Sequence, residues 1–152
     1  MKINHYQVPV IHSLKHTMNV IRDLEKKTLI DKEFVNFVNR NFRTLCNECY
    51  PKLVHSFVIQ NFKYKEDIFD EFIQAPYVLL QSKLGDCDDF SLFIHSTLRI
   101  LNQNPKYIVF GKAPGKFTHI AVFCNGRIID GTNANFNDWK SILRKYNYYL
   151  YP

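Results

Sequence analysis

Apolar side chains recur at three- and four-residue spacing along residues 14–62, a pattern typical of amphipathic helices. The first predicted helix has Ser13 as its candidate N-cap, the second follows Asp31, and the third begins near Pro51. Their apolar positions are Leu14, Met18, Ile21 and Leu24; Phe34, Val38, Phe42 and Leu45; and Leu53, Val54, Phe57, Val58 and Phe62. The first part of the chain is therefore predicted to be helical.

The pattern changes at Ala75, where the sequence predicts a loop that runs to Gly85. The next segment, DCDDFSLFIHSTLRIL, again has helical spacing, and Asp86 is its natural N-cap. Its apolar positions are Phe90, Phe93, Ile94, Leu98 and Leu101. Cys87 is thus expected in the first turn of a mostly buried helix.

The last third of the chain contains three short stretches typical of strands, at residues 107–110, 119–124 and 127–130. Asn125-Gly126, between the last two, is a strong signal for a β-hairpin. A short helix, DWKSILRKY, is expected after them, capped by Asn137 or Asp138, and a Tyr-rich tail follows. Helices followed by an antiparallel sheet predict an α+β fold.

A two-residue turn at Asn125-Gly126 determines which hairpin residues face each other. It places Ala121 opposite Asp130, and His119 shares a face with Ala121 because side chains alternate along a strand. His119 and Asp130 are then diagonal neighbours with Cβ atoms about 7 Å apart, so they can hydrogen-bond. An aspartate that orients an imidazole is half of a nucleophile-activating site, because the imidazole takes the nucleophile's proton.

Cys87 is the candidate nucleophile of this site. A helix N-terminus favours a thiolate, whereas the adjacent Asp86, Asp88 and Asp89 would raise the pKa of the thiol. An imidazolium partner would be needed to offset them. The same carboxylates could suggest a metal site, but we favour helix capping and charge compensation in the first turn.

From about His55 to Asn133 the chain resembles the transglutaminase-like superfamily, in its small microbial and phage branch. The matching segments are IQAPYVLLQSKLGDCDDFSLF, THIAVF and RIIDGT. The resemblance implies a papain-like core, in which the cysteine opens a helix packed on a small antiparallel sheet. It also implies a catalytic triad of Cys87, His119 and Asp130. In papain-like enzymes a glutamine six residues before the cysteine helps form the oxyanion hole, and this role extends to Gln81.

The 152 residues are expected to form a single domain. It would comprise a helical N-terminal extension over about 1–54, a transglutaminase-like core over about 55–133, and a C-terminal helix and tail over 134–152. The net charge is +6, but the basic residues are scattered, so nucleic acid is an unfavoured partner. With neither a membrane-spanning stretch nor a signal peptide, the chain is expected in the cytoplasm, of the host cell if it is phage-encoded, or in a virion.

The remaining cysteines and histidines have no clear chemical assignment. Cys46 and Cys49 form a lone CxxC, which His12 and His16 could complete as a zinc site, although two packing cysteines with free thiols are the favoured interpretation. Cys124 is expected to be structural. Three histidines have no predicted partner: His5, His55 and His95.

The resemblance implies a cysteine-dependent acyl-transfer enzyme. It would hydrolyse or transamidate amides of peptide or protein substrates through a thioester on Cys87, without a metal or other cofactor. The alternative is a phage virion or assembly component that uses the fold as a scaffold. In that case the tail YNYYLYP would dock onto other subunits.

Overall fold

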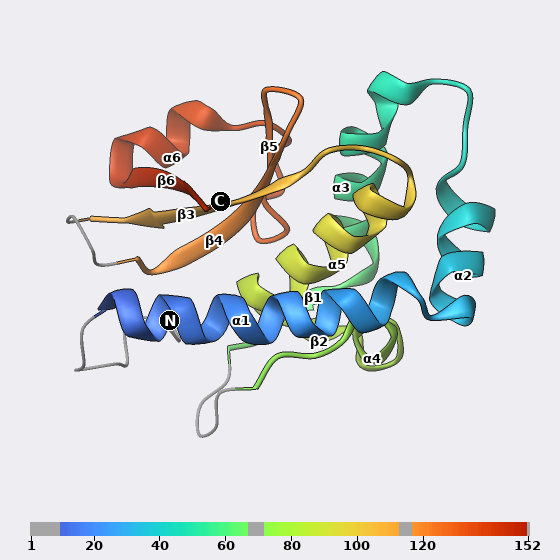
Figure 1. Ribbon diagram of the computed structural model, residues 1–152. Helices are drawn as coiled ribbons and strands as arrows, with labels where there is room; N and C mark the ends of the chain where they lie inside the picture. Colours follow the sequence, from blue (N-terminus) through green and yellow to red (C-terminus); the bar gives the residue numbers. More distant parts are fainter. Residues whose placement is uncertain (1–9, 67–71, 113–116, 152) are drawn as a thin grey trace.

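The computed structural model describes residues 10–66, 72–112 and 117–151, with side chains from Leu14 onward (Figure 1). The predicted α+β fold is confirmed. The helices are α1 (Val10–Leu29), α2 (Lys32–Phe42), α3 (Tyr50–Asn61), α4 (Pro76–Ser82), α5 (Cys87–Ile100) and α6 (Trp139–Lys145). The strands are β1 (Lys63–Tyr64), β2 (Leu84–Gly85), β3 (Lys106–Gly111), β4 (His119–Cys124), β5 (Arg127–Ile129) and β6 (Asn147–Tyr151).

Strands β3 to β6 form an antiparallel sheet in the order β5-β4-β3-β6. The predicted hairpin register between β4 and β5 is confirmed, with Cys124 opposite Arg127. Asn125 and Gly126 adopt φ angles of 53° and 76°, the positive values that a two-residue hairpin turn of this type requires. The local turn chemistry therefore sets the register, as expected from the sequence.

Helix α5 lies at the centre of the molecule, between one face of this sheet and helices α1, α3 and α4 (Figure 1). Its side chains are buried without interruption from Cys87 to Leu98, which is the behaviour of a helix that is covered on all sides. Aromatic rings of α5 pack in T-shaped and stacked pairs with rings of α2, of α3 and of its C-cap residue: Phe34, Phe57, Phe62, Phe90 and Phe93. On the opposite face of the sheet, Ile142 of α6 packs against Ile108, Phe110, Ala121 and Ile128.

Several predicted boundaries were wrong. Helix α1 begins at Val10, before Ser13, because no proline or glycine between these positions interrupts it. Helix α2 ends at Phe42, so Leu45 lies outside it and is fully exposed. Within α3, Leu53 is 41% exposed, whereas Val54 and Val58 are buried.

Two segments expected to be irregular have regular structure. Residues 75–85 contain α4 and β2 because Pro76 suits the first turn of a helix and Leu79 becomes buried in the common core. The Tyr-rich tail forms β6, which pairs with β3 of the same chain. No described helix is long and apolar enough to cross a membrane.

Candidate active site

His119 and Asp130 are hydrogen-bonded at the edge of the sheet. His119 is the first residue of β4, Asp130 directly follows β5, and the His119 Nε2 and Asp130 Oδ2 atoms are 2.6 Å apart. Their side chains are 12% and 7% exposed, so little water competes for this contact. The contact joins the two side chains that the hairpin register places together.

The second carboxylate oxygen of Asp130 is also engaged. Asp130 Oδ1 accepts hydrogen bonds from Thr132 N (2.9 Å) and Thr132 Oγ1 (2.8 Å). Burial pushes the pKa of Asp130 upward, but the His119 charge and the hydrogen bonds from His119 and Thr132 outweigh burial and hold the pKa below its usual value. The carboxylate is therefore ionised and accepts from Nε2, which leaves Nδ1 as the imidazole nitrogen that can take a proton.

Cys87 lies at the first position of α5, against strand β4. The Cys87 thiol donates to Asp88 Oδ1 at 3.8 Å, and the backbone N–H of Ile120, the residue after His119, acts to lower the pKa of the thiol. Ser91 Oγ donates to the Ile120 carbonyl at 3.1 Å. The cysteine is 4% exposed. Burial, followed by the charges of Asp88 and Asp86, raises the pKa of the Cys87 thiol well above its usual value. At neutral pH this thiol is protonated.

The carboxylates beside Cys87 cap the helix, as the sequence predicted. Asp86 Oδ1 accepts from Asp88 N (3.1 Å) and Asp89 N (3.5 Å), and Asp89 Oδ2 accepts from Asp86 N (3.0 Å) in a reciprocal capping box. The other Asp89 oxygen accepts from Gln74 N at 2.8 Å. Among the described residues, no group of three or more His, Cys, Asp or Glu side chains is arranged to hold a metal ion.

Gln81, the predicted oxyanion-hole residue, is exposed on α4, where its side chain hydrogen-bonds that of Tyr77. Sequence reasoning missed another polar neighbour of the site, Tyr64 on β1. Burial and the charges of Cys87, Glu66, Asp86 and Asp88 raise the pKa of Tyr64 to about 12. Tyr64 comes near the site because β1 pairs in parallel with β2, and two-residue strands have no periodicity to detect.

A cavity of about 220 Å³ opens beside the His119–Asp130 pair, and its lining includes Thr132, Asn133 and Tyr146. Cys87 is not among its lining residues. A larger cavity of about 770 Å³ lies away from this pair, between α1, the end of α5 and strands β3 and β6. The smaller cavity is the one that reaches the His119 imidazole.

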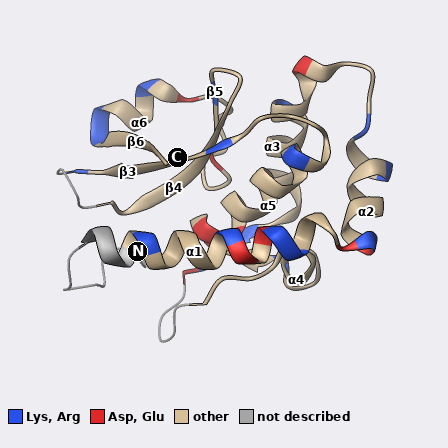
Figure 2. Cartoon of the chain, in the orientation of Figure 1, with Lys and Arg blue, Asp and Glu red and all other residues tan. Residues whose placement is uncertain are grey.

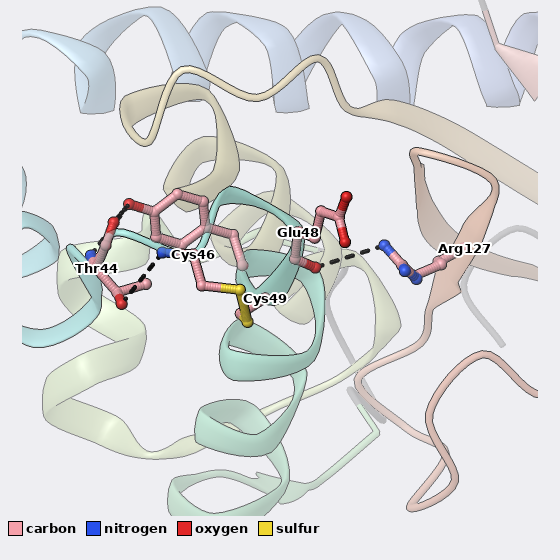
Figure 3. The surroundings of a disulfide bond; sticks show 6 residues. Thr44, Cys46, Glu48, Cys49 and Arg127 are labelled. Atoms are coloured by element: carbon pink, nitrogen blue, oxygen red, sulfur yellow. Dashed lines mark hydrogen bonds between the residues drawn. A yellow bond between two sulfur atoms is a disulfide. The ribbon is translucent and has the colours of Figure 1, made fainter.

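Cys46 and Cys49 are joined by a disulfide, so the prediction of free packing thiols was wrong (Figure 3). The 3-10 turn Asn47–Cys49 brings their Cα atoms to 5.4 Å, within the usual range for a disulfide. His16 is exposed, and the His12 side chain lies outside the described part of the chain. Cys124 is a buried free cysteine, as expected.

The histidines predicted to have no partner include two that are hydrogen-bonded. His95 Nδ1 pairs with Glu25 of α1, and the His95 ring stacks on Tyr107. His55 Nε2 lies 2.7 Å from the Asn133 carbonyl oxygen. Both partners are distant in sequence, so local spacing could not reveal them. His5 lies outside the described residues.

Comparison with known proteins establishes the fold. No protein-family model and no curated protein matches the chain. LapG of Legionella pneumophila superposes with a TM-score of 0.63 at 15% identity, over 87% of this chain and 83% of LapG. Its calcium-bound form gives a TM-score of 0.62.

Two further solved structures are similar over smaller parts of their own length. A candidate cysteine protease from Cytophaga hutchinsonii has a TM-score of 0.52 and 14% identity, over 76% of this chain and 40% of that protein. A candidate protease from Parabacteroides distasonis has a TM-score of 0.56 and 8% identity, over 78% and 30% respectively. The chain thus shares the α+β fold of these solved structures, which is consistent with a papain-like core.

Proposed function

We propose that the chain is a cysteine-dependent acyl-transfer enzyme that acts on amides of peptide or protein substrates. Cys87 is the nucleophile, His119 the general base and acid, and Asp130 the residue that orients the imidazole. The observation that carries this proposal is the hydrogen bond between His119 and Asp130. His119 begins strand β4, and the next residue of that strand, Ile120, lies next to Cys87. The fold shared with cysteine proteases supports it.

The mechanism begins with a neutral thiol, because burial and the neighbouring carboxylates disfavour the thiolate. As the Cys87 sulfur attacks the substrate carbonyl carbon, His119 Nδ1 takes the thiol proton and the ionised Asp130 stabilises the imidazolium. His119 then protonates the departing amine, which leaves a thioester on Cys87. Water or an amine attacks the thioester, and this second step makes the enzyme a hydrolase or a transglutaminase.

Two side chains are candidates for the hydrogen-bond donor to the developing oxyanion. Gln81 has the offset found in papain-like enzymes, although its side chain bonds Tyr77 in this structure. Tyr64 is close enough for the Cys87 charge to affect its pKa, and with a pKa of about 12 its phenol keeps the proton that a donor needs. We propose Gln81 as the donor once a substrate displaces Tyr77, and comparison of Gln81→Ala with Tyr64→Phe distinguishes the two.

Calcium, which LapG binds in one of its structures, is not part of this mechanism. Asp86 Oδ1 and Asp89 Oδ2 accept from backbone N–H groups as helix caps, and Asp89 Oδ1 accepts from Gln74 N. The described residues contain no cluster of three or more ligating side chains. We derive no step through a metal ion.

The alternative function, a phage virion or assembly component, is favoured by one feature. Strand β6 is an edge strand, and it exposes Tyr148, Tyr149 and Leu150 by 50%, 48% and 37%. An exposed edge with large apolar side chains can pair with another chain. The mass of the protein in solution tests this proposal, because a monomer at high concentration would count against it.

Alkylation of the native protein with iodoacetamide tests the activated thiol. Peptide mass spectrometry gives separate rates for Cys87 and Cys124, which is also buried and free and serves as the internal reference. We expect Cys87 to react faster than Cys124 at neutral pH, and His119→Ala to slow Cys87 about 100-fold while Cys124 is unaffected. Cys87→Ser verifies the peptide assignment. Equal Cys87 rates with and without His119 would contradict the mechanism.

A further inference from the structure

The Cys46–Cys49 disulfide is expected to stabilise the fold only slightly. It closes a loop with a sequence separation of 3, for which the entropic stabilisation is at its smallest, and it joins no distant elements. The loop before it is held in another way, because the Tyr50 hydroxyl donates to Thr44 O (2.8 Å) and accepts from Thr44 N (3.1 Å) (Figure 3). Tyr50 itself is 1% exposed.

The position of the disulfide suits thiol–disulfide exchange instead. Cys46 is exposed and Cys49 partly so, which gives an attacking thiol access to the bond. The 3-10 turn Asn47–Cys49 leads directly into the twelve-residue helix α3, so both sulfurs lie at the start of a helical segment. The positive end of a helix stabilises a thiolate and so favours it as a leaving group.

The disulfide turn is also connected to the segment that carries Asp130. Arg127 Nη1 donates to the Glu48 carbonyl at 3.5 Å, within the CxxC turn (Figure 3). Further along α3, His55 Nε2 lies 2.7 Å from Asn133 O, and Asn133 N donates to Asp130 O at 3.1 Å. A movement of the CxxC turn would therefore be transmitted to both ends of the segment 127–133, through the Arg127–Glu48 and the His55–Asn133 contacts.

We propose that Cys46 and Cys49 form a reversible dithiol–disulfide couple that exchanges with a cellular dithiol and controls the position of the Asp130 segment. One thiolate of the donor attacks Cys46 Sγ, forming a mixed disulfide and releasing Cys49 as a thiolate, which takes a proton. The second donor thiol then resolves the mixed disulfide. Cys46 and Cys49 gain two electrons and two protons in total, and the donor becomes a disulfide. The effect on activity rests on the proposed function.

The first test is a redox titration of the folded protein in the Cys87→Ser background, with reduced and oxidised dithiothreitol as the probe. Thiols are trapped by alkylation and Cys46 and Cys49 are counted by mass spectrometry. We expect both to convert together and reversibly while the protein stays folded. A pair that is reduced only after unfolding in urea, or that does not reoxidise, would overturn the proposal.

The second test measures the coupling without catalysis. Trp139 is the sole tryptophan, and its Nε1 donates to Gly126 O at 3.4 Å, next to Arg127. We expect the fluorescence emission of Trp139 to shift when Cys46 and Cys49 are reduced. The shift should be lost in Arg127→Gln, a variant that keeps both cysteines. Unchanged emission on reduction would overturn the coupling. This test also uses the Cys87→Ser background. Because neither test depends on Cys87, a failure of the redox proposal is distinguishable from a failure of the proposed enzymatic function.

Discussion

At the scale of single residues, opposing effects act on the pKa of the Cys87 thiol. Burial and the charges of Asp88 and Asp86 raise the pKa of its thiol, and only the Ile120 N–H acts in the opposite direction among the main contributions. A thiol in this environment needs a base at the moment of attack. His119 can serve as that base only if its ring is correctly oriented, and Asp130 provides the orientation. The proposed chemistry thus depends on Asp130, a hydrogen-bond acceptor that would act through His119 without contacting the substrate.

Replacing Asp130 by asparagine tests this dependence. We expect Asp130→Asn to slow Cys87 alkylation by about 100-fold or more, because an amide does not stabilise the imidazolium. The pKa of Asp130 is lowered in the fold, so its ionised form contributes stability above the pKa of unfolded aspartate, about 3.9. That contribution is lost as the pH falls through the folded value.

Urea unfolding of both proteins at neutral pH and below about pH 4 measures this contribution. The free energy of unfolding should fall less steeply with acid in Asp130→Asn than in the wild type. An identical acid dependence would show that the carboxylate is not stabilised by its partners.

At the scale of elements, the start of α5 combines a structural role with the chemical role proposed for Cys87. The capping box of Asp86 and Asp89 satisfies backbone N–H groups that the buried helix end could not expose to water. The same carboxylates raise the pKa of Cys87, so stabilisation of the helix opposes activation of the proposed nucleophile.

Basic side chains are spread over several elements, including α1, α2 and α6, without a single cluster in this view (Figure 2).

Removing the cap should separate these two roles. We expect Asp86→Ala to destabilise the protein by about 2 kcal/mol, because the cap is buried, and to lower the pKa of Cys87. The matched control is Asp31→Ala, which removes the more exposed cap of α2 and should cost about 1 kcal/mol. Urea unfolding and the pH dependence of Cys87 alkylation are the measurements. Equal costs for the two caps, or an unchanged Cys87 profile, would contradict the expectation.

At the scale of the whole molecule, a buried polar network joins the N-terminal helix to the core. Glu25 of α1 is 4% exposed and bonds His95 and Arg99 of α5 as well as the Tyr107 hydroxyl of β3 (3.1 Å). Burial raises the pKa of Glu25, but His95, Arg99 and Tyr107 together hold it below the usual value. One carboxylate of α1 thus contacts both α5 and β3.

Glu25→Ala should destabilise the protein by about 3 kcal/mol, because it leaves His95 and Tyr107 without their buried partner. Asp23→Ala, on the exposed side of the same helix, is the control and should change stability by less than about 0.5 kcal/mol. The wild type should also lose the Glu25 contribution as the pH falls, since the folded pKa lies below the unfolded one. Equal effects of the two variants on urea unfolding would refute a structural role for the network.

Features that depend on neighbouring residues could be predicted from the amino-acid sequence. The Asn125-Gly126 turn set the hairpin register and so paired His119 with Asp130, because two positive φ angles permit few connections. Asp86 and Asp31 were recognisable as caps because each side chain bonds backbone N–H groups two and three residues ahead. These interactions act over a few positions, so spacing alone encodes them.

Only the tertiary structure decided which distant surfaces meet. The contact of Cys87 with Ile120, the burial of Glu25 against His95, and the pairing of β6 with β3 all join residues far apart in the chain. Apolar periodicity predicts that a helix or strand face is buried but not which element covers it. The hydrophobic effect is non-directional, so any apolar surface of matching shape can serve as the partner. The His119–Asp130 pair therefore follows from local turn chemistry, whereas the approach of Cys87 to that strand required the packing of the whole core.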